Sequence, residues 1–173
     1  ASKGEGLGNQ FLANIRETDA ILHVLRCFDD PNIVHVDGSV DPVRDKEVID
    51  MELQLKDLET VENRIAKVQK QAQTGGDKNA KKLYEILLRY KEALEQGKSC
   101  RTVKFENAED KQLAKELFLL TDKPVMYVCN VDENSAKSGN EYVEKVREAV
   151  KDEDAEILVI AAKIESDIAE LES

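Results

Sequence analysis

The sequence predicts an α/β domain that is interrupted by an inserted, all-helical module. Three observations support this fold class. Short apolar segments with strand character occur near both ends of the chain, and between them apolar residues recur at helical spacings across residues 44–121. After residue 122, strand and helix patterns alternate, as they do in domains built on a parallel sheet. We therefore expect residues 1–43 and 122–173 to form the α/β domain and residues 44–121 to form the insertion.

The first predicted elements are a helix and a strand. A glycine-dense opening precedes residues 9–17, where Phe11, Leu12 and Ile15 fall on one side of a helix. Residues 20–28 are almost continuously apolar, which is typical of a strand covered on both faces in a parallel sheet. Turn-rich loops then surround the short apolar piece at residues 33–36.

The sequence of the insertion predicts a helical hairpin. Helical spacing without Pro or Gly relates Met51, Leu55, Leu58, Ile65, Val68 and Ala72. After a glycine turn at residues 74–77, spacings of three and four relate Ala80, Leu83, Leu87, Tyr90 and Leu94. These patterns predict two long antiparallel helices packed as a short coiled coil. A third helix is expected over residues 108–120, with Leu113, Leu117 and Leu120 on one face.

The remaining chain alternates between strands and helices. Strands are predicted at residues 124–130 and 156–161, and helices at residues 139–150 and 164–171. The apolar runs are too short to span a bilayer, and no signal segment opens the chain, so we expect a soluble, cytoplasmic protein without a membrane partner. The three cysteines are odd in number and far apart, which favours reduced thiols.

The charge is unevenly distributed. The chain carries −11 overall, but residues 64–104 hold eleven basic residues and four acids, a net +7 against −18 elsewhere. A basic lobe of this kind can bind phosphate groups, and an ordinary solvated helical face is the alternative.

Polar residues follow the two later strands, where ligands bind in doubly wound sheets. The segments are Asn130-Val131-Asp132-Glu133 and Ala161-Ala162-Lys163. They resemble the fourth and fifth motifs of GTPase-type P-loop proteins, although Asn-x-x-Glu alone also fits a chance loop. In the usual motif, Asn-Lys-x-Asp, the Asp accepts two hydrogens from guanine and the Lys stacks on the base. With Val131 and Glu133 in their places, guanine preference should weaken and ATP becomes the expected nucleotide.

Longer stretches carry a more specific resemblance. Residues 1–20, 24–28, 32–36, 130–133 and 167–171, together with the helical insertion, resemble the YchF (Obg-like) family of P-loop nucleotide hydrolases. The resemblance covers essentially the whole chain. It implies part of a nucleotide-binding G-type domain with a coiled-coil insertion, slow hydrolysis of ATP and often GTP, and association with the ribosome.

The resemblance also implies what the chain lacks. These residues contain no G-x-x-x-x-G-K-[ST] loop, so the phosphate and Mg²⁺ ligands should lie outside the chain, upstream, with a TGS-like domain downstream. We therefore expect an internal piece of a longer protein that is inactive alone. No water-positioning Gln can be assigned. His35, in a loop after the first strand, is our candidate catalytic residue, with a His packed at the loop base as the alternative.

The resemblance also implies a binding partner for the basic residues of segment 64–104. We expect ribosomal RNA to be contacted through its backbone by the lysines around the hairpin turn, Lys67, Lys70, Lys78, Lys81 and Lys82. A non-catalytic helical binding module on a small α/β scaffold is the competing hypothesis for the whole chain.

Overall fold

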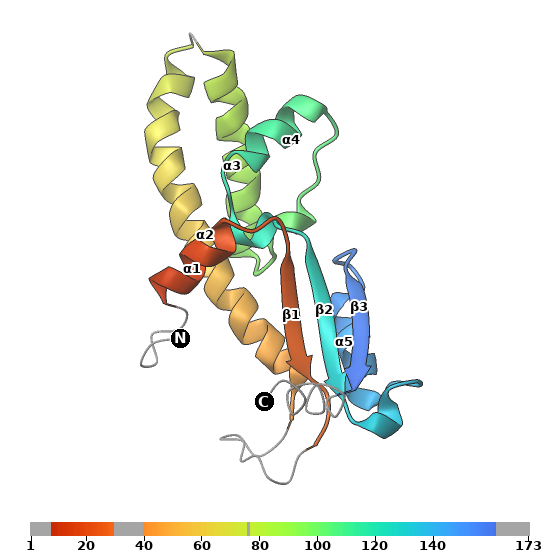
Figure 1. The fold of residues 1–173 in the computed structure, drawn as a ribbon. Helices are drawn as coiled ribbons and strands as arrows, with labels where there is room; N and C mark the ends of the chain where they lie inside the picture. The colour runs from red at the N-terminus through yellow and green to blue at the C-terminus, as the bar shows by residue number, and fades with distance from the viewer. Residues whose placement is uncertain (1–7, 30–39, 76, 162–173) are drawn as a thin grey trace. The chain divides into compact units, whose positions relative to one another are not determined.

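The computed structural model describes residues 8–29, 40–75 and 77–161. Its main elements are α1 (Asn9–Arg16), β1 (Ile21–Arg26), α2 (Pro42–Gln73), α3 (Lys78–Glu95), α4 (Ala108–Lys115), β2 (Val125–Val131), α5 (Glu141–Val150) and β3 (Glu156–Ala161) (Figure 1). Short 3-10 turns add η1 (Cys100–Thr102), η2 (Leu120–Asp122) and η3 (Glu133–Ser135). The predicted α/β class with a helical excursion between its first two strands is confirmed. The predicted helix at residues 164–171 and the apolar piece at 33–36 lie outside the described residues.

The chain divides into two compact units. The helical unit contains the described residues through Asp19 together with Ile49–Pro124, and the α/β unit contains the described parts of Ala20–Val48 and the chain from Val125 onward. This division differs from the expected boundaries, because α1 groups with the helices and the first turns of α2 group with the sheet.

Packing explains why α1 belongs to the helical unit. Leu12 of α1 is buried together with Leu53 of α2 and Leu120 of η2. In addition, the Lys123 ammonium donates hydrogen bonds to the backbone carbonyls of Arg16 and Thr18. The amphipathic pattern predicted α1 itself, but nothing in it specified which unit the helix would join.

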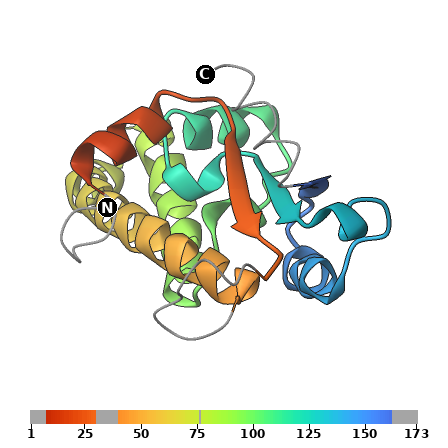
Figure 2. The ribbon, with the colours of Figure 1, turned by 60° about the horizontal axis from the view of Figure 1, so that its bottom comes forward.

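The three strands form a parallel sheet in the order β1-β2-β3. Leu25 of β1 pairs with Cys129 of β2, which pairs with Val159 of β3. Helix α5 lies against one face of this sheet (Figure 2), where its valines join a core with the inward residues of the strands: Leu25, Cys27, Tyr127, Cys129, Val131, Val143, Val146 and Val150. The predicted parallel sheet is therefore confirmed.

The opposite face of the sheet is open within the described part of the chain. Leu22 and Val24 of β1 are 66% and 59% exposed, and Leu158 of β3 is 49% exposed. The register places Val128 of β2 between Val24 and Leu158, and Val128 is only 7% exposed, so the exposed residues of this face lie on the two outer strands. Within the described residues, the prediction that β1 is covered on both faces is therefore not met at Leu22 and Val24. An apolar run shows that a strand belongs to a parallel sheet, but not that both of its faces are covered.

Helices α2 and α3 form the predicted antiparallel hairpin (Figure 1). Their seam is lined by Val61, Val68, Ala80, Leu87 and Tyr90, with Leu58, Ile65 and Leu83 beside them. The chain reverses at Gly75, whose φ of +75° is readily adopted only by glycine. Asp77 then caps α3 by accepting hydrogen bonds from the amides of Asn79 (3.0 Å) and Ala80 (3.3 Å).

Two predicted seam residues lie elsewhere. Met51 and Leu55 are 59% and 60% exposed, because this part of α2 buries Leu53 and Asp57 instead. In this part of α2, apolar residues at helical spacing occur on more than one face of the helix. The inward face also contains the buried Asp57, so the apolar pattern alone does not indicate which face is buried.

The third helix of the insertion is shorter than predicted. Helix α4 ends at Lys115, and Phe118 adopts a left-handed φ of 52°, which a continuing α-helix excludes. Leu113 and Leu117 pack into the hairpin core, whereas Leu120 joins the cluster around α1. The predicted common face of Leu113, Leu117 and Leu120 is therefore split between two clusters.

A buried carboxylate organises the turn after α4. Asp57 is 2% exposed and accepts hydrogen bonds from the Leu120 amide (2.8 Å), the Thr121 amide (2.7 Å) and the Thr121 hydroxyl (2.7 Å). The same hydroxyl accepts a hydrogen bond from the Cys100 amide at 2.9 Å. Helix α2 thereby fixes both η1 and η2 through one side chain.

A second buried polar group fastens the start of α2 within the α/β unit. The Lys46 ammonium lies 3.1 Å from a Glu153 carboxylate oxygen, with both side chains largely buried. Glu153 also accepts a 2.7 Å hydrogen bond from the Tyr127 hydroxyl, and Lys46 lies over the ring of Tyr127 at 5.5 Å. Strand β2, the turn before β3 and the first turns of α2 are joined by this group.

Candidate functional site

The carboxyl ends of β2 and β3 meet at one edge of the sheet. Asn130 pairs with Ile160 and Val131 with Ala161, so the ends of the two strands lie next to each other. The structure therefore brings Asn130, Val131 and Ala161 together, and Glu133 follows two residues after Val131. The other predicted site residues of this domain, His35, Ala162 and Lys163, lie outside the described residues.

The turn after β2 holds Glu133 at this edge. Asp132 precedes the turn η3, and its carboxylate accepts a hydrogen bond from the Ser135 amide at 3.0 Å. Glu133 opens the turn and is exposed. Asp132 therefore caps the turn, and Glu133 is the exposed carboxylate that follows it.

Asn140 ties the edge to the end of β1. Its amide nitrogen donates to the Cys27 carbonyl at 2.8 Å, while its amide oxygen accepts from the Val143 amide at 3.0 Å and caps α5. The Cys27 amide in turn donates to the Asn130 carbonyl at 2.7 Å. The ends of β1 and β2 and the start of α5 are thus held by a continuous set of hydrogen bonds.

Burial limits how two predicted residues can contact a ligand. Val131 is fully buried in the core beneath α5, and Ala161 is only 3% exposed. Neither side chain can lie against a base from this position. Any contact that these residues make with a nucleotide must come from their backbone amides or carbonyls.

Arg26 lies at the same edge and was not singled out from the sequence. It pairs with Asn130 in the strand register, and its guanidinium lies 5.0 Å from the centre of the Phe28 ring. The available signal was that Arg26 is the only fully charged residue in the apolar run of residues 20–28. It places a cation beside Asn130.

The two thiols near this edge are structural. Cys27 and Cys129 are both free and fully buried. A hydrogen bond with the Cys129 thiol, together with burial, raises the pKa of Cys27. Because both sulfurs are buried, neither is presented to solvent as a nucleophile.

Gly97-Lys98-Ser99 matches the last three residues of a phosphate-binding loop but is built differently. Gly97, with φ of +76°, follows the end of α3, and the buried Ser99 hydroxyl accepts a 3.1 Å hydrogen bond from Gln54. A phosphate-binding loop connects a strand to the start of a helix. This segment instead follows a helix and leads into η1, so it cannot serve as that loop.

The predicted RNA-contacting lysines surround the tip of the hairpin. Lys67 and Lys70 of α2 and Lys78 and Lys81 of α3 are exposed. Val68 and Ala80 on the same turns are buried in the seam, so helical geometry directs these lysines away from it on the outer faces of the two helices. The lysines are therefore spread around the tip instead of forming one flat patch.

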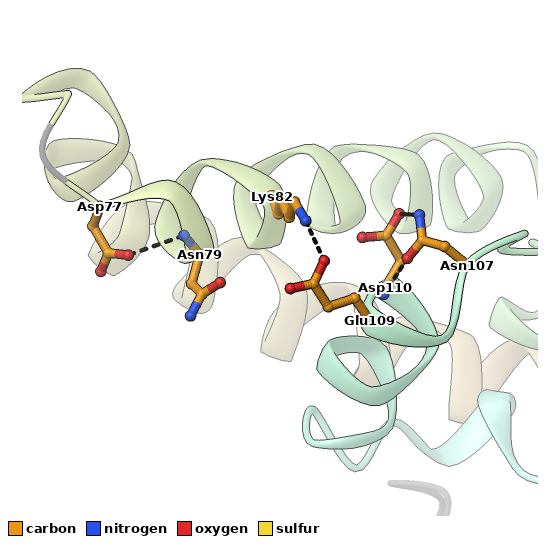
Figure 3. A network of polar contacts seen from close by, with 6 residues as sticks. All are labelled: Asp77, Asn79, Lys82, Asn107, Glu109 and Asp110. Atoms are coloured by element: carbon orange, nitrogen blue, oxygen red, sulfur yellow. Dashed lines mark hydrogen bonds and ion pairs between the residues drawn. The ribbon is translucent and has the colours of Figure 1, made fainter.

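Lys82 differs from the other four lysines. Its ammonium forms an ion pair with Glu109 in the first turn of α4 (Figure 3). Asn107 caps that turn by accepting a 2.7 Å hydrogen bond from the Asp110 amide. Sequence reasoning did not find this pairing, because the partners are 27 residues apart.

Two further properties follow from the described residues. Across these ranges, no group of three or more His, Cys, Asp or Glu side chains is arranged to hold a metal ion. No helix in the same ranges combines the length and apolar character that crossing a membrane requires.

Comparisons with known proteins agree on one family. The chain is 55% identical to a protein named "Ribosome-binding ATPase YchF" from Bacillus subtilis and 48% identical to one of the same name from Escherichia coli O157:H7, over 99% of this chain and 47% of each relative. It is 41% identical to "Obg-like ATPase 1" from Oryza sativa over 92% of this chain and 40% of that protein. No protein-family model matches.

A solved structure has the same fold. The structure of the Schizosaccharomyces pombe YchF GTPase superposes with a TM-score of 0.79 and 34% sequence identity, over 93% of this chain and 44% of that one. The chain thus spans about half the length of the curated relatives it matches.

Proposed function

Because this chain belongs to the family of YchF and Obg-like ATPases, we propose that it supplies the base-binding edge and helical insertion of a P-loop ATPase that associates with the ribosome. The observation that carries the proposal is the parallel register that sets Asn130 and Ala161 at one edge of the sheet. In parallel α/β sheets this edge is where ligands bind. By sequence order we assign residues 1–43 and 122–173 to the nucleotide-binding domain and residues 44–121 to the insertion, with α1 packed in the helical unit and the first turns of α2 in the α/β unit.

The open face of the sheet supports a larger nucleotide-binding domain. Parallel sheets are normally covered on both faces, yet Leu22, Val24 and Leu158 are largely exposed. Further polypeptide covering this face would complete the domain. The phosphate-binding loop and the Mg²⁺ ligands then belong to residues other than those described.

The base is held by a small set of groups. The Asn130 amide oxygen is buried, so its amide nitrogen is the group proposed to face the base, and the Glu133 carboxylate supplies acceptors only. Backbone groups of Val131, Ala161 and Ala162 border the base, with Lys163 next to them. Mg²⁺, when bound with the nucleotide, neutralises charge on the phosphates.

ATP is the favoured nucleotide. Glu133 is one methylene longer than the Asp that grips guanine in related GTPases, and Val131 offers no side chain for stacking because it is buried. His35 is the proposed catalytic residue, where a neutral imidazole would orient or deprotonate water.

A nucleotide titration tests this part of the proposal. The whole protein should bind a fluorescent ATP analogue at least as tightly as the GTP analogue. Glu133→Asp should shift the ratio toward GTP, and Glu141→Asp, an exposed carboxylate on α5, should leave it unchanged. A strong GTP preference in the unaltered protein would contradict the roles given to Val131 and Glu133.

Ribosome association is assigned to the hairpin tip. Lys67, Lys70, Lys78 and Lys81, with Lys82 at the edge of this group, are proposed to contact the phosphate backbone of ribosomal RNA in the cytoplasm. The spread of the lysines around the tip suits contact with more than one strand and provides no base reading.

Cosedimentation tests this assignment. Lys78→Glu with Lys81→Glu should weaken ribosome binding and flatten its salt dependence, because two phosphate contacts are lost. Lys145→Glu with Lys151→Glu makes the same change of charge on α5 and the residue that follows it, and should have little effect. Equal binding by the two double variants would refute the role of the hairpin.

A further inference from the structure

Lys82 already has an anionic partner within the chain. Its ammonium contacts a Glu109 carboxylate oxygen, joining α3 to the first turn of α4 (Figure 3). The side chains are 41% and 67% exposed, so water and a polyanion can both reach the pair. Within the described ranges, no ion pair with a carboxylate is formed by the other four tip lysines, Lys67, Lys70, Lys78 and Lys81.

Glu109 is held in place independently of Lys82. The Asn107 side chain bonds both the amide of Asp110 (2.7 Å) and its carboxylate (2.9 Å), which fixes the first turn of α4. Further along, Ala114 is buried in the hairpin core, with Leu113 packed against it. Helix α4 therefore presents Glu109 to Lys82 whether or not the ion pair forms.

The electrostatics of the pair are those of a phosphate contact. The hydrogen bond to Glu109 raises the pKa of Lys82, with a smaller contribution from the charge of Asp110. The same hydrogen bond lowers the pKa of Glu109. A carboxylate oxygen thus takes one of the three donors of the ammonium, as an RNA phosphate oxygen would.

We propose that Glu109 withholds Lys82 from RNA and so limits the phosphate-binding surface of the hairpin to the other four lysines. This inference rests on the proposed role of the hairpin in binding ribosomal RNA. Lys82 joins the surface only when a phosphate displaces Glu109, and that exchange replaces one ion pair with another. Glu109 is therefore a determinant of affinity that does not itself touch RNA.

The effect of freeing Lys82 follows from counterion release. One added phosphate contact steepens the dependence of log K on log salt by about 0.7 for single-stranded RNA. Glu109→Gln should thus bind fluorescein-labelled oligouridylate about eightfold more tightly at about 50 mM KCl and about threefold more tightly at about 200 mM. In the otherwise unaltered chain, Lys82→Gln should change affinity less than Lys81→Gln does.

Two controls isolate the pair. Glu59→Gln removes an exposed carboxylate that pairs with Lys56 on α2, and it should leave RNA affinity unchanged. Glu109→Gln in a Lys82→Gln background should also have no effect. If the gain persisted in that background, Glu109 would act by general repulsion, and the proposal would fall.

The anisotropy titrations separate this proposal from the one it rests on. If the unaltered chain binds, and Lys81→Gln weakens it, but Glu109→Gln adds nothing, only the role of Glu109 is overturned. If neither the unaltered chain nor Glu109→Gln binds RNA, both proposals are overturned. A gain from Glu109→Gln that requires Lys82, with a steeper salt slope, is the supporting result.

Discussion

Replacing Asp57 with alanine should severely destabilise the helical unit. The carboxylate accepts three hydrogen bonds of 2.7–2.8 Å from Leu120 and Thr121, and the site is closed to water. Alanine would leave these donors buried without an acceptor. Leu120 is itself fully buried in the cluster around α1, so the turn that carries it cannot easily move toward solvent.

The size of the loss comes from two opposed effects. Each buried donor left without a partner costs about 1–3 kcal/mol, and three such donors in one turn share part of that cost through local movement. Burial raises the pKa of Asp57, which shows that its ionised form is itself desolvated, so its removal returns some free energy. The net loss should be about 3–5 kcal/mol, a large part of the roughly 5–15 kcal/mol that typical domains possess.

Urea unfolding followed by circular dichroism at 222 nm measures this loss, because the helical unit contains most of the helix. The midpoint of the helical transition should fall while its slope stays constant. Glu59→Ala is the matched control: it removes an exposed acid from the same helix together with a surface ion pair to Lys56, worth about 0–1 kcal/mol. A loss of less than about 1 kcal/mol for Asp57→Ala would show that other groups or water satisfy the donors, and the argument would be wrong.

Two further predictions concern titration and a buried ion pair. Burial is the main cause that raises the pKa of Asp122 to about 6, so the stability from its neutral form is complete below pH of about 4 and is lost as the pH rises through about 6. The free energy of unfolding of Asp122→Asn, measured relative to the unaltered chain by urea titration, should therefore rise by about 1–3 kcal/mol between pH 4 and pH 7, since solvent screens part of the effect at this partly exposed carboxyl. A constant difference would contradict this. Lys46→Met should destabilise the α/β unit by about 3–5 kcal/mol by leaving Glu153 buried without its cation, with partial recovery in Lys46→Met/Glu153→Gln as measured by thermal unfolding.

The sequence predicted those elements whose residues repeat with a local period. Strand β3 begins and ends at its predicted residues, and the hairpin turns at the predicted glycine segment. Period and turn chemistry are properties of neighbouring residues, so they can be read without coordinates. The position of Asn130 and Ala161 at the carboxyl edge of the sheet was predictable for the same reason, because each residue lies at the end of a predicted strand.

Features that depend on distant partners were not predictable. Asp57 stands among polar and apolar residues of α2 with no local sign that it would be buried, because its donors are 63 and 64 residues away. Lys82 looked equivalent to Lys78 and Lys81 until α4 brought Glu109 to it. The early end of α4 depends on the left-handed backbone of Phe118, a conformation that an aromatic residue seldom adopts and that no sequence pattern signals.

Under the proposed function, the burial of Val131 would make weak guanine selection depend on the fold as well as on one side chain. Its inward position is shared with Tyr127 and Cys129 on the face covered by α5, and all three are fully buried. A lysine introduced there would have to place its ammonium in that core or pull the end of β2 away from α5, since it cannot reach a base from the inward face. Glu133→Asp alone can therefore restore the carboxylate position but not the stacking stem. Under the proposed function, that variant should shift preference toward GTP without reaching the selectivity of a protein that has both residues.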